Sequence, residues 1–228
     1  MGVLQEKMRR DLRLRGFSTT TESSYLHYMR GYVRYFGVSP EKLNLEHVQK
    51  YHLHLIHRKL SPQSINVAMA AIRFFYLITL QKNWNEKAIP WMKVKRGVPV
   101  VLSPEVVGQL LNAVRDIKYR ALLSTIYSAG LRIGEAVKLS AKDIDSRRML
   151  IHVRFGKGNK ERYSLLSSVL LELLRRYWVE NRDDKSTYLF PCSRYPQKPV
   201  DRCLVRTILL TALKRSGIEK REIGRAHV

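Results

Sequence analysis

Two short stretches decide the fold: AGLRIGEAVKL at residues 129–139 and FGKGNKERYSLL at residues 155–166. In the first stretch, apolar residues recur at three- and four-residue spacing, which predicts a helix over 131–139. The second stretch places a glycine-rich turn between two runs of alternating residues, 149–155 and 162–166, which predicts a β-hairpin. The hydrophobic period therefore changes from helical to extended between the two stretches.

Taken singly, each stretch has an ordinary explanation. Arg132 could be a surface arginine paired with Glu135 one helical turn away, and GKGNK could be a solvated turn. The glycine-rich turn is not a nucleotide-binding Walker loop, because the pattern GxxxxGK[ST] is absent. The two stretches become informative only together, in this order and with 25 residues between Arg132 and Lys157.

Helical periodicity continues on both sides of these stretches. The first part of the chain predicts four helices, at 4–14, 21–36, 45–59 and 61–80. Further helices are predicted at 104–114, 119–128, 169–179 and 201–216. Residues 85–103 contain Pro90, Gly97 and Pro99 and lack this periodicity, so we interpret them as an interdomain linker. We expect a mainly α protein in which a helical bundle, 1–84, precedes a second domain, 104–221, with a small β-hairpin or sheet.

The charge of the chain indicates a polyanionic partner. Lys and Arg number 42 and Asp and Glu 19, which gives a formal net charge of +23. Residues 1–101 carry 17 basic and 6 acidic side chains, and residues 102–228 carry 25 and 13. Since a hydrophobic content of 45% indicates a folded chain rather than a basic tail, two cationic folded halves favour a clamp around nucleic acid. Solvated surface charge is the alternative.

Several other classes of protein are disfavoured. The two cysteines, Cys192 and Cys203, do not make a disulfide framework or a metal-binding pattern, so we expect the reducing cytoplasm. The basic N-terminal segment lacks the apolar run of a secretory signal. No window reaches the roughly 18 consecutive apolar residues of a membrane span.

The sequence resembles the tyrosine recombinase (phage integrase) family, especially bacterial integron-like integrases. AGLRIGEAVKL followed in register by GKGNKER is the specific signal, and the helices of residues 9–37 and 60–76 add a weaker one. The resemblance covers nearly the whole chain. It implies a helical core-binding domain of the SAM-like type, followed by the α+β catalytic domain of these enzymes, here incomplete at its C-terminal end.

The resemblance also implies a reaction that needs no metal and no other cofactor. In the family, a tyrosine hydroxyl attacks a DNA phosphodiester, and a 3′-phosphotyrosyl link and a free 5′-hydroxyl form. Arg132 matches the first catalytic arginine, whose guanidinium suits the charge that develops on the phosphate oxygens. Lys157 matches the lysine that protonates the leaving oxygen, with Lys160 as the alternative, and Glu135 matches an acidic residue that would orient Arg132.

Other family residues are missing from their expected place. A His-x-x-Arg motif, a further His or Trp and the nucleophilic tyrosine should follow the last predicted helix, yet the last of twelve tyrosines is Tyr195. The one His-x-x-Arg match, His27 to Arg30, lies in an N-terminal helix and receives no catalytic role. Residues 222–228, EIGRAHV, resemble a sequencing-adapter oligonucleotide read in frame. We therefore expect a truncated and inactive chain with a non-native tail, in which His227 is not catalytic; a natural frameshift is the alternative.

The expected partner is double-stranded DNA, bound by a parent protein that acts as a homotetramer on two DNA sites. Phosphate-contact candidates are basic and polar residues of the first domain and the linker: Arg30, Arg34, Gln63, Ser64, Arg73, Lys93, Lys95 and Arg96. The expected function is site-specific DNA recombination or integration. A DNA-binding relic without activity is the alternative, and an RNA-binding protein is a third reading.

Overall fold

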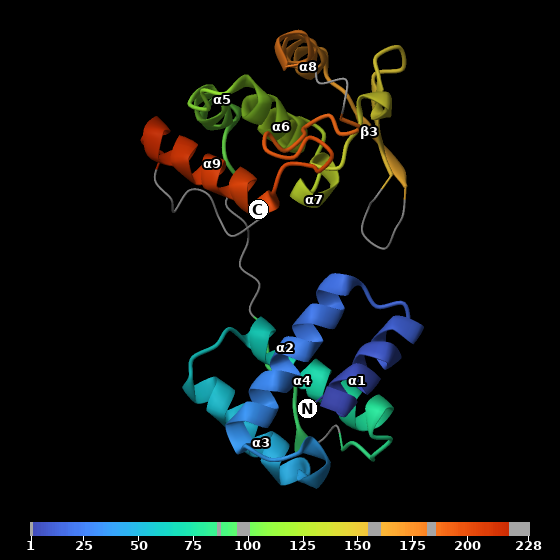
Figure 1. The fold of residues 1–228 in the computed structure, drawn as a ribbon. Helices are drawn as coiled ribbons and strands as arrows, with labels where there is room; N and C mark the ends of the chain where they lie inside the picture. The colour runs from blue at the N-terminus through green and yellow to red at the C-terminus, as the bar shows by residue number, and fades with distance from the viewer. Residues whose placement is uncertain (1, 86–87, 95–100, 155–160, 182–185, 219–228) are drawn as a thin grey trace. The chain divides into compact units, whose positions relative to one another are not determined.

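The computed structural model describes residues 2–85, 88–94, 101–154, 161–181 and 186–218. The chain folds as two compact units, Met1–Gly97 and Val98–Val228, which divide inside the predicted linker. Each unit has its own hydrophobic core. The predicted fold class is confirmed, because helices dominate and the strands form one small sheet (Figure 1).

The first unit consists of the four predicted helices. They are α1 (Gly2–Leu14), α2 (Thr19–Phe36), α3 (Leu45–His57) and α4 (Pro62–Phe74). A short 3-10 turn, η1 (Pro40–Lys42), lies between α2 and α3, and α4 continues directly into a π-helical turn, η2 (Phe75–Thr79). The predicted fourth helix is therefore present along its predicted length, but its last turn is widened.

Local sequence signals set the ends of these helices. Ser18 and Ser61 precede α2 and α4, and each side chain accepts a hydrogen bond from the backbone N–H three residues later. Gly37 ends α2 in the left-handed conformation, with φ 69°, and its N–H donates to the carbonyl of Val33. Local hydrogen bonds thus fix both ends of α2.

A buried aromatic and aliphatic core holds the first unit together. Helix α2 packs along α4, and α1 packs against both α2 and η2. Tyr32 is fully buried, and its hydroxyl lies 3.1 Å from that of Tyr76, which donates to the carbonyl of Pro40 at 3.2 Å. The tyrosine hydroxyls therefore have partners inside an otherwise apolar core. Its largest members include Met8, Leu12, Met29, Ile65, Ile72 and Phe75.

Part of the predicted linker is anchored to the first unit. The backbone N–H of Met92 donates to Asn66 Oδ1 at 2.8 Å, and Asn66 Nδ2 donates to the carbonyl of Met92 at 2.9 Å. Gln49 Nε2 donates to the carbonyl of Ala88 at 3.0 Å, and Ile89 is buried. The described residues of this segment form no α-helix, as the sequence predicts, but side chains of α3 and α4 hold the segment in place.

The second unit combines helices with a three-stranded antiparallel sheet. Its helices are α5 (Pro104–Asn112), α6 (Ile117–Ser128), α7 (Ile133–Ala136), α8 (Ser168–Asn181) and α9 (Arg202–Ser216), with a 3-10 turn, η4 (Ala141–Asp143). The strands β1 (Ile144–Asp145), β2 (Leu150–Val153) and β3 (Arg162–Leu165) lie in that order in the sheet. The predicted hairpin is confirmed, with Ile151 opposite Ser164 and Val153 opposite Arg162.

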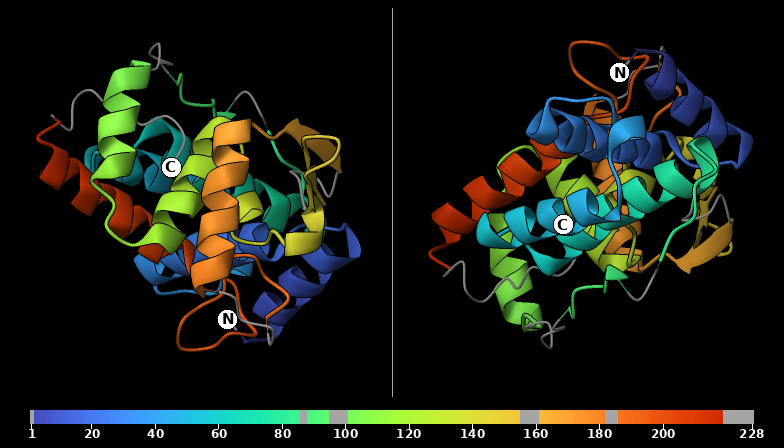
Figure 2. Two further views of the ribbon diagram at one scale, coloured as in Figure 1. Left: turned by 90° about the horizontal axis from the view of Figure 1, so that it is seen from above. Right: turned by 90° about the horizontal axis from the view of Figure 1, so that it is seen from below.

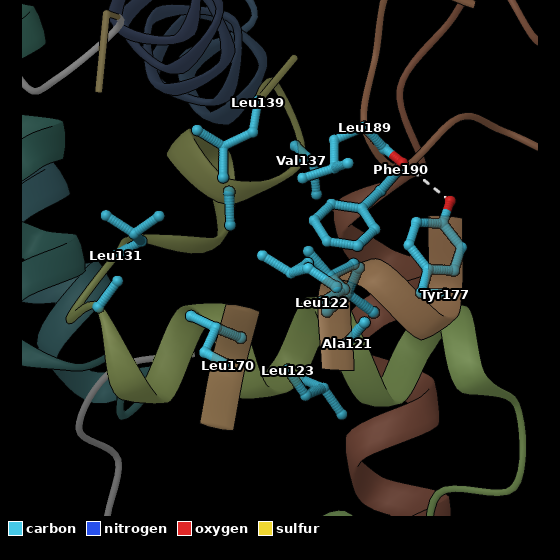
Figure 3. Close-up of a cluster of buried hydrophobic side chains, with 14 of the residues drawn as sticks. Ala121, Leu122, Leu123, Leu131, Val137, Leu139, Leu170, Tyr177, Leu189 and Phe190 are labelled. Atoms are coloured by element: carbon cyan, nitrogen blue, oxygen red, sulfur yellow. Dashed lines mark hydrogen bonds between the residues drawn. The ribbon is translucent and has the colours of Figure 1, made fainter. Parts of the chain in front are cut away.

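The core of the second unit forms where α6, α8 and the sheet meet. Helix α8 packs along α6, as the left view of Figure 2 shows. Leu122 lies at the centre of the cluster, and Phe190 stacks on Tyr177 (Figure 3). The Tyr177 hydroxyl donates to the carbonyl of Leu189 at 2.8 Å, which ties the loop before α9 to α8. The turn that carries Arg132 packs on this core through Leu131.

Two elements differ from the sequence-based expectation. The helix predicted over 131–139 is only four residues long, because Lys138 and Leu139 make tighter i to i−3 bonds and Ser140 then caps η4. Four of its apolar residues are nevertheless buried: Leu131, Ala136, Val137 and Leu139. Strand β1 was not predicted, since two residues are too short to show a period.

The structure describes both cysteines and most of the helical sequence. Cys192 and Cys203 are both free thiols, the first half-buried and the second exposed. Across the described ranges, no helix has both the length and the apolar character needed to cross a lipid bilayer.

Candidate active site

Arg132 lies in a tight turn between α6 and α7. Gly130 ends α6 with φ 59°, a left-handed conformation that glycine adopts without steric cost, and the N–H of Leu131 donates to the carbonyl of Ile126 at 3.0 Å. Leu131 is buried, whereas the next side chain, Arg132, is 62% exposed. The turn thus anchors one residue in the core and presents the guanidinium of the next to solvent.

Glu135 is a buried carboxylate that binds Arg132. Its side chain is only 3% exposed, and it lies three residues after Arg132, in the single turn of α7. Oε2 accepts from the backbone N–H of Arg132 at 3.0 Å, and Oε1 accepts from Arg132 Nη1 at 2.9 Å. The same carboxylate therefore caps the helix and orients the arginine.

A second arginine, Arg162 at the start of β3, completes the carboxylate's hydrogen bonding. Arg162 Nη1 donates to Glu135 Oε1 at 3.1 Å, and Nη2 donates to Oε2 at 2.7 Å. This is the parallel, two-bond geometry that is strongest between a guanidinium and a carboxylate. Glu135 thus binds one cation three residues before it and another 27 residues after it in sequence.

The two arginines keep Glu135 ionised. The hydrogen bonds from Arg162, and then those from the backbone and side chain of Arg132, lower the pKa of Glu135 to about 2, although burial of the carboxylate opposes this shift. The same pair raises the pKa of Arg162. At neutral pH the site therefore consists of one buried negative charge and two positive charges.

Arg162 was not among the predicted site residues. A usable signal was present: β3 alternates, and Arg162 shares the partly buried face of the strand with Ser164. A charged residue on the inward face of a strand requires a partner, and Glu135 is that partner. Arg202, at the start of α9, lies beside the same turn. It lies against Gly134, where a Cβ would be 3.7 Å from Arg202 Nη1.

Both halves of the chain match known protein families. The profile described as "Phage integrase family" matches residues 100–227, more than half of the chain. The profile described as "Phage integrase, N-terminal SAM-like domain" matches residues 4–86. This chain belongs to the phage integrase family. The predicted resemblance is confirmed in both halves.

Named relatives agree with the family. This integrase chain is 43% identical over 196 residues to a putative integrase/recombinase of Sinorhizobium fredii, covering 85% of this chain and 63% of the relative. It is 32% identical to a tyrosine recombinase XerA of Thermococcus kodakarensis, covering 90% of this chain and 71% of that protein. A crystal structure of a lambda integrase tetramer bound to a Holliday junction matches with a TM-score of 0.74 at 14% identity, over 96% of this chain and 64% of the other. That last likeness concerns the fold alone.

The strands on either side of the other predicted catalytic residues are described. Lys157 and Lys160 fall outside the described residues, but the base of their hairpin is described. Arg154, just after β2, donates from Nε to Asp143 Oδ1 at 2.6 Å, and His152 stacks on Tyr163 with ring centroids 4.9 Å apart. The strands that lead to and from the predicted lysines are therefore firmly held.

The structure describes six of the eight residues that are predicted to contact DNA. Arg30 and Arg34, one helical turn apart on α2, are both exposed, as are Gln63 and Lys93. The hydroxyl of Ser64 lies 2.8 Å from that of Ser61, in the cap of α4. Arg73 is half-buried, and Lys95 and Arg96 lie outside the described residues. All of the described DNA-contact candidates belong to the first unit, whereas Arg132 belongs to the second.

Proposed function

We propose that this integrase acts in site-specific DNA recombination, in which DNA strands are cut and rejoined through a phosphotyrosyl intermediate. One observation carries the proposal: Arg132 is an exposed guanidinium whose orientation is set by a buried, ionised carboxylate. A prealigned cation of this kind lowers the free energy of a phosphoryl transition state without reorganisation during the reaction. The names of the relatives, integrase/recombinase and tyrosine recombinase, support the same function.

Each residue is assigned one step. Arg132 binds the non-bridging oxygens of the scissile phosphate as negative charge gathers on them. Lys157, or alternatively Lys160, donates a proton to the departing 5′ oxygen. Glu135 touches no reacting atom, and its role is to orient Arg132 through the two hydrogen bonds described above.

The nucleophile is assigned to sequence beyond these 228 residues. The chain spans less than two thirds of the length of the Sinorhizobium relative, and no tyrosine follows Tyr195. We propose that the His-x-x-Arg motif and the tyrosine lie in the part of the relative's length that this chain does not cover, and that the 228 residues bind DNA without cutting it. Residues 222–228 fall outside the described residues.

The proposed partner is duplex DNA, bound in the cytoplasm by both units. Residues 1–84 would act as the core-binding domain and residues 104–221 as the catalytic part, with residues 85–103 between them. Arg30, Arg34, Arg73 and the basic residues 93–96 would contact phosphates. The lambda integrase neighbour was crystallised as a tetramer on a Holliday junction, which supports a homotetramer on two DNA sites for the parent protein.

The decisive experiment reads the source DNA beyond the codon for Arg221 and expresses the extended protein. Its formation of a covalent 3′ adduct would be measured on a duplex selected from a random library. We expect the extended protein to form the adduct and Arg132→Ala to lose it. Arg148→Ala is a matched control, since Arg148 is also exposed and pairs three residues away, with Asp145. If both variants form the adduct at the wild-type rate, the role of Arg132 is wrong.

A second experiment tests the ligand with the chain as it exists. We expect duplex DNA to compete for binding better than structured RNA, and log affinity to fall with log salt by about 0.9 per neutralised phosphate. Preference for RNA would favour the RNA-binding alternative. A flat salt dependence would contradict the clamp.

A further inference from the structure

The two arginines at Glu135 are bound unequally. Arg162 uses both of its terminal nitrogens and occupies both carboxylate oxygens, at 3.1 and 2.7 Å. The side chain of Arg132 makes one bond, from Nη1 to Oε1 at 2.9 Å, and within the described residues it has no other. The exposed fractions follow the same order, 38% for Arg162 and 62% for Arg132.

This asymmetry affects what Arg132 can bind. An arginine beside an ionised carboxylate prefers the two-bond arrangement, since each charge-assisted hydrogen bond adds stability. If Arg162 were absent, Oε2 would keep only its bond from the backbone N–H of Arg132 and could accept a second bond from the Arg132 guanidinium. The guanidinium would then turn inward, and its charge would be neutralised by the carboxylate instead of by a phosphate.

We infer that Arg162 is a positioning residue: by occupying both oxygens of Glu135, it keeps the guanidinium of Arg132 free for a phosphate. This inference rests on the proposed function of Arg132. Arg162 also opens the strand that follows the hairpin turn of Lys157 and Lys160. One carboxylate therefore ties the base of the predicted lysine hairpin to the turn that presents Arg132.

The other side of the same hairpin offers a matched control. Arg154 donates to Asp143, a carboxylate whose side chain is 5% exposed and which also accepts from the backbone N–H of Ser140 at 2.8 Å. This pair resembles Arg162–Glu135 in burial and chemistry. Its carboxylate makes no bond with Arg132 in the described structure, so loss of Arg154 tests the effect of losing an ion pair alone.

The test uses the present chain with ¹⁵N-labelled arginine and inorganic phosphate as the probe. Phosphate would be titrated while the guanidinium signals of Arg132, assigned with Arg132→Ala, are followed by NMR. We expect Arg162→Ala to weaken phosphate binding at Arg132 about tenfold, the equivalent of one charge-assisted hydrogen bond. Arg162→Lys, which keeps the charge but loses the planar fork, should weaken it less, and Arg154→Ala should leave it unchanged.

A double variant gives the sharpest result. In Arg162→Ala with Glu135→Gln, the carboxylate that would capture Arg132 is gone, so phosphate binding should recover most of its wild-type strength. A purely structural role for Arg162 predicts the opposite, further loss in the double variant. Equal weakening by Arg162→Ala and Arg154→Ala, or no recovery in the double variant, would overturn the inference.

A readout without phosphate separates this inference from the proposed function. In Arg162→Ala, more of the Arg132 Nη protons should become protected from exchange, because Arg132 takes over both oxygens of Glu135. Unchanged exchange of these protons contradicts the positioning role, whatever Arg132 binds. If the protons do become protected but wild-type Arg132 shows no phosphate binding, the positioning role stands and the proposed function of Arg132 fails. The exchange comparison uses Arg162→Lys if Arg162→Ala does not fold.

Discussion

Both units of the molecule contain a buried glutamate held by two arginines. In the first unit, Glu22 in the first turn of α2 binds Arg13 through two hydrogen bonds of 2.9 and 3.2 Å and lies 3.2 Å from Arg9 Nε. In the second unit, Glu135 binds Arg162 and Arg132. The pKa is lowered at both carboxylates, in each case first by the arginine that makes the two-bond contact.

The difference lies in where the arginines come from. Arg9 and Arg13 are one turn apart on the same helix, so Glu22 joins α1 to α2 as a packing contact. The arginines of Glu135 come from a tight turn and from a strand, and the more exposed of the two, Arg132, makes only one side-chain bond. In the first unit, by contrast, the more exposed arginine, Arg13, makes both of the hydrogen bonds to Glu22 described above. The same chemistry therefore stabilises packing in one unit and leaves a cation available in the other.

The largest expected effect is on DNA cleavage. In the extended recombinase, we expect Arg132→Ala to reduce strand transfer by about 10³-fold, because the transition state loses its main cation. Arg13→Ala, which removes an equally exposed arginine of the Glu22 cluster, should leave the rate of cleavage near that of the wild type on pre-bound DNA. Single-turnover kinetics would measure both. Equal losses would show that the two clusters do not differ in function.

The next effect is on stability. Glu135→Ala leaves Arg132 and Arg162 without their shared anion, and we expect the free energy of unfolding of the second unit to fall by about 2–3 kcal/mol. Glu22→Ala should cost the first unit less, since the Glu22 side chain is 11% exposed whereas that of Glu135 is 3% exposed. Urea unfolding followed by amide exchange would resolve the two units. A larger loss for Glu22→Ala would reverse the comparison.

The two carboxylates should respond to acid in the same direction. Because the folded-state pKa of Glu135 is about 2, below its ordinary 4.5, its contribution to stability is complete above about pH 4.5 and is lost as the pH falls toward 2. Glu135→Gln should flatten the stability of the second unit in this window. Glu22→Gln should do the same for the first unit, in the same direction, since the pKa of Glu22 is also lowered. Acid titration by circular dichroism would test this, and an unchanged slope in Glu135→Gln would contradict the pairing.

The smallest effect concerns the glycines that end α2 and α6. Gly37 and Gly130 have φ of 69° and 59°, and a Cβ at either position would meet nothing within 4 Å. Gly37→Ala and Gly130→Ala should each cost about 1 kcal/mol, from backbone strain alone. Only Gly130→Ala should also weaken phosphate binding at Arg132, two residues away. Thermal unfolding and the phosphate titration would separate the two effects.

Much of the fold could be predicted because its signals are local. Ser18 and Gly37 define α2 through their own backbone contacts, and the alternation after residue 149 defines the hairpin. The length of α7 could not be predicted, since the burial of Leu131 and Leu139 fits either a helix or a turn. Arg132 and Glu135 could be paired because they are three residues apart, whereas Arg162 was missed because its partner lies 27 residues away.

The sequence by itself determined the family, the order of the helices, the hairpin and the pairing of Arg132 with Glu135. These depend on hydrophobic period, caps and short spacings, which act within a few residues of the chain. Only the tertiary structure decided that Glu135 is buried and that Arg162 occupies both of its oxygens. The strength and geometry of that contact arise when α7 and β3 pack together, because packing removes the carboxylate from water and aligns it with a distant guanidinium.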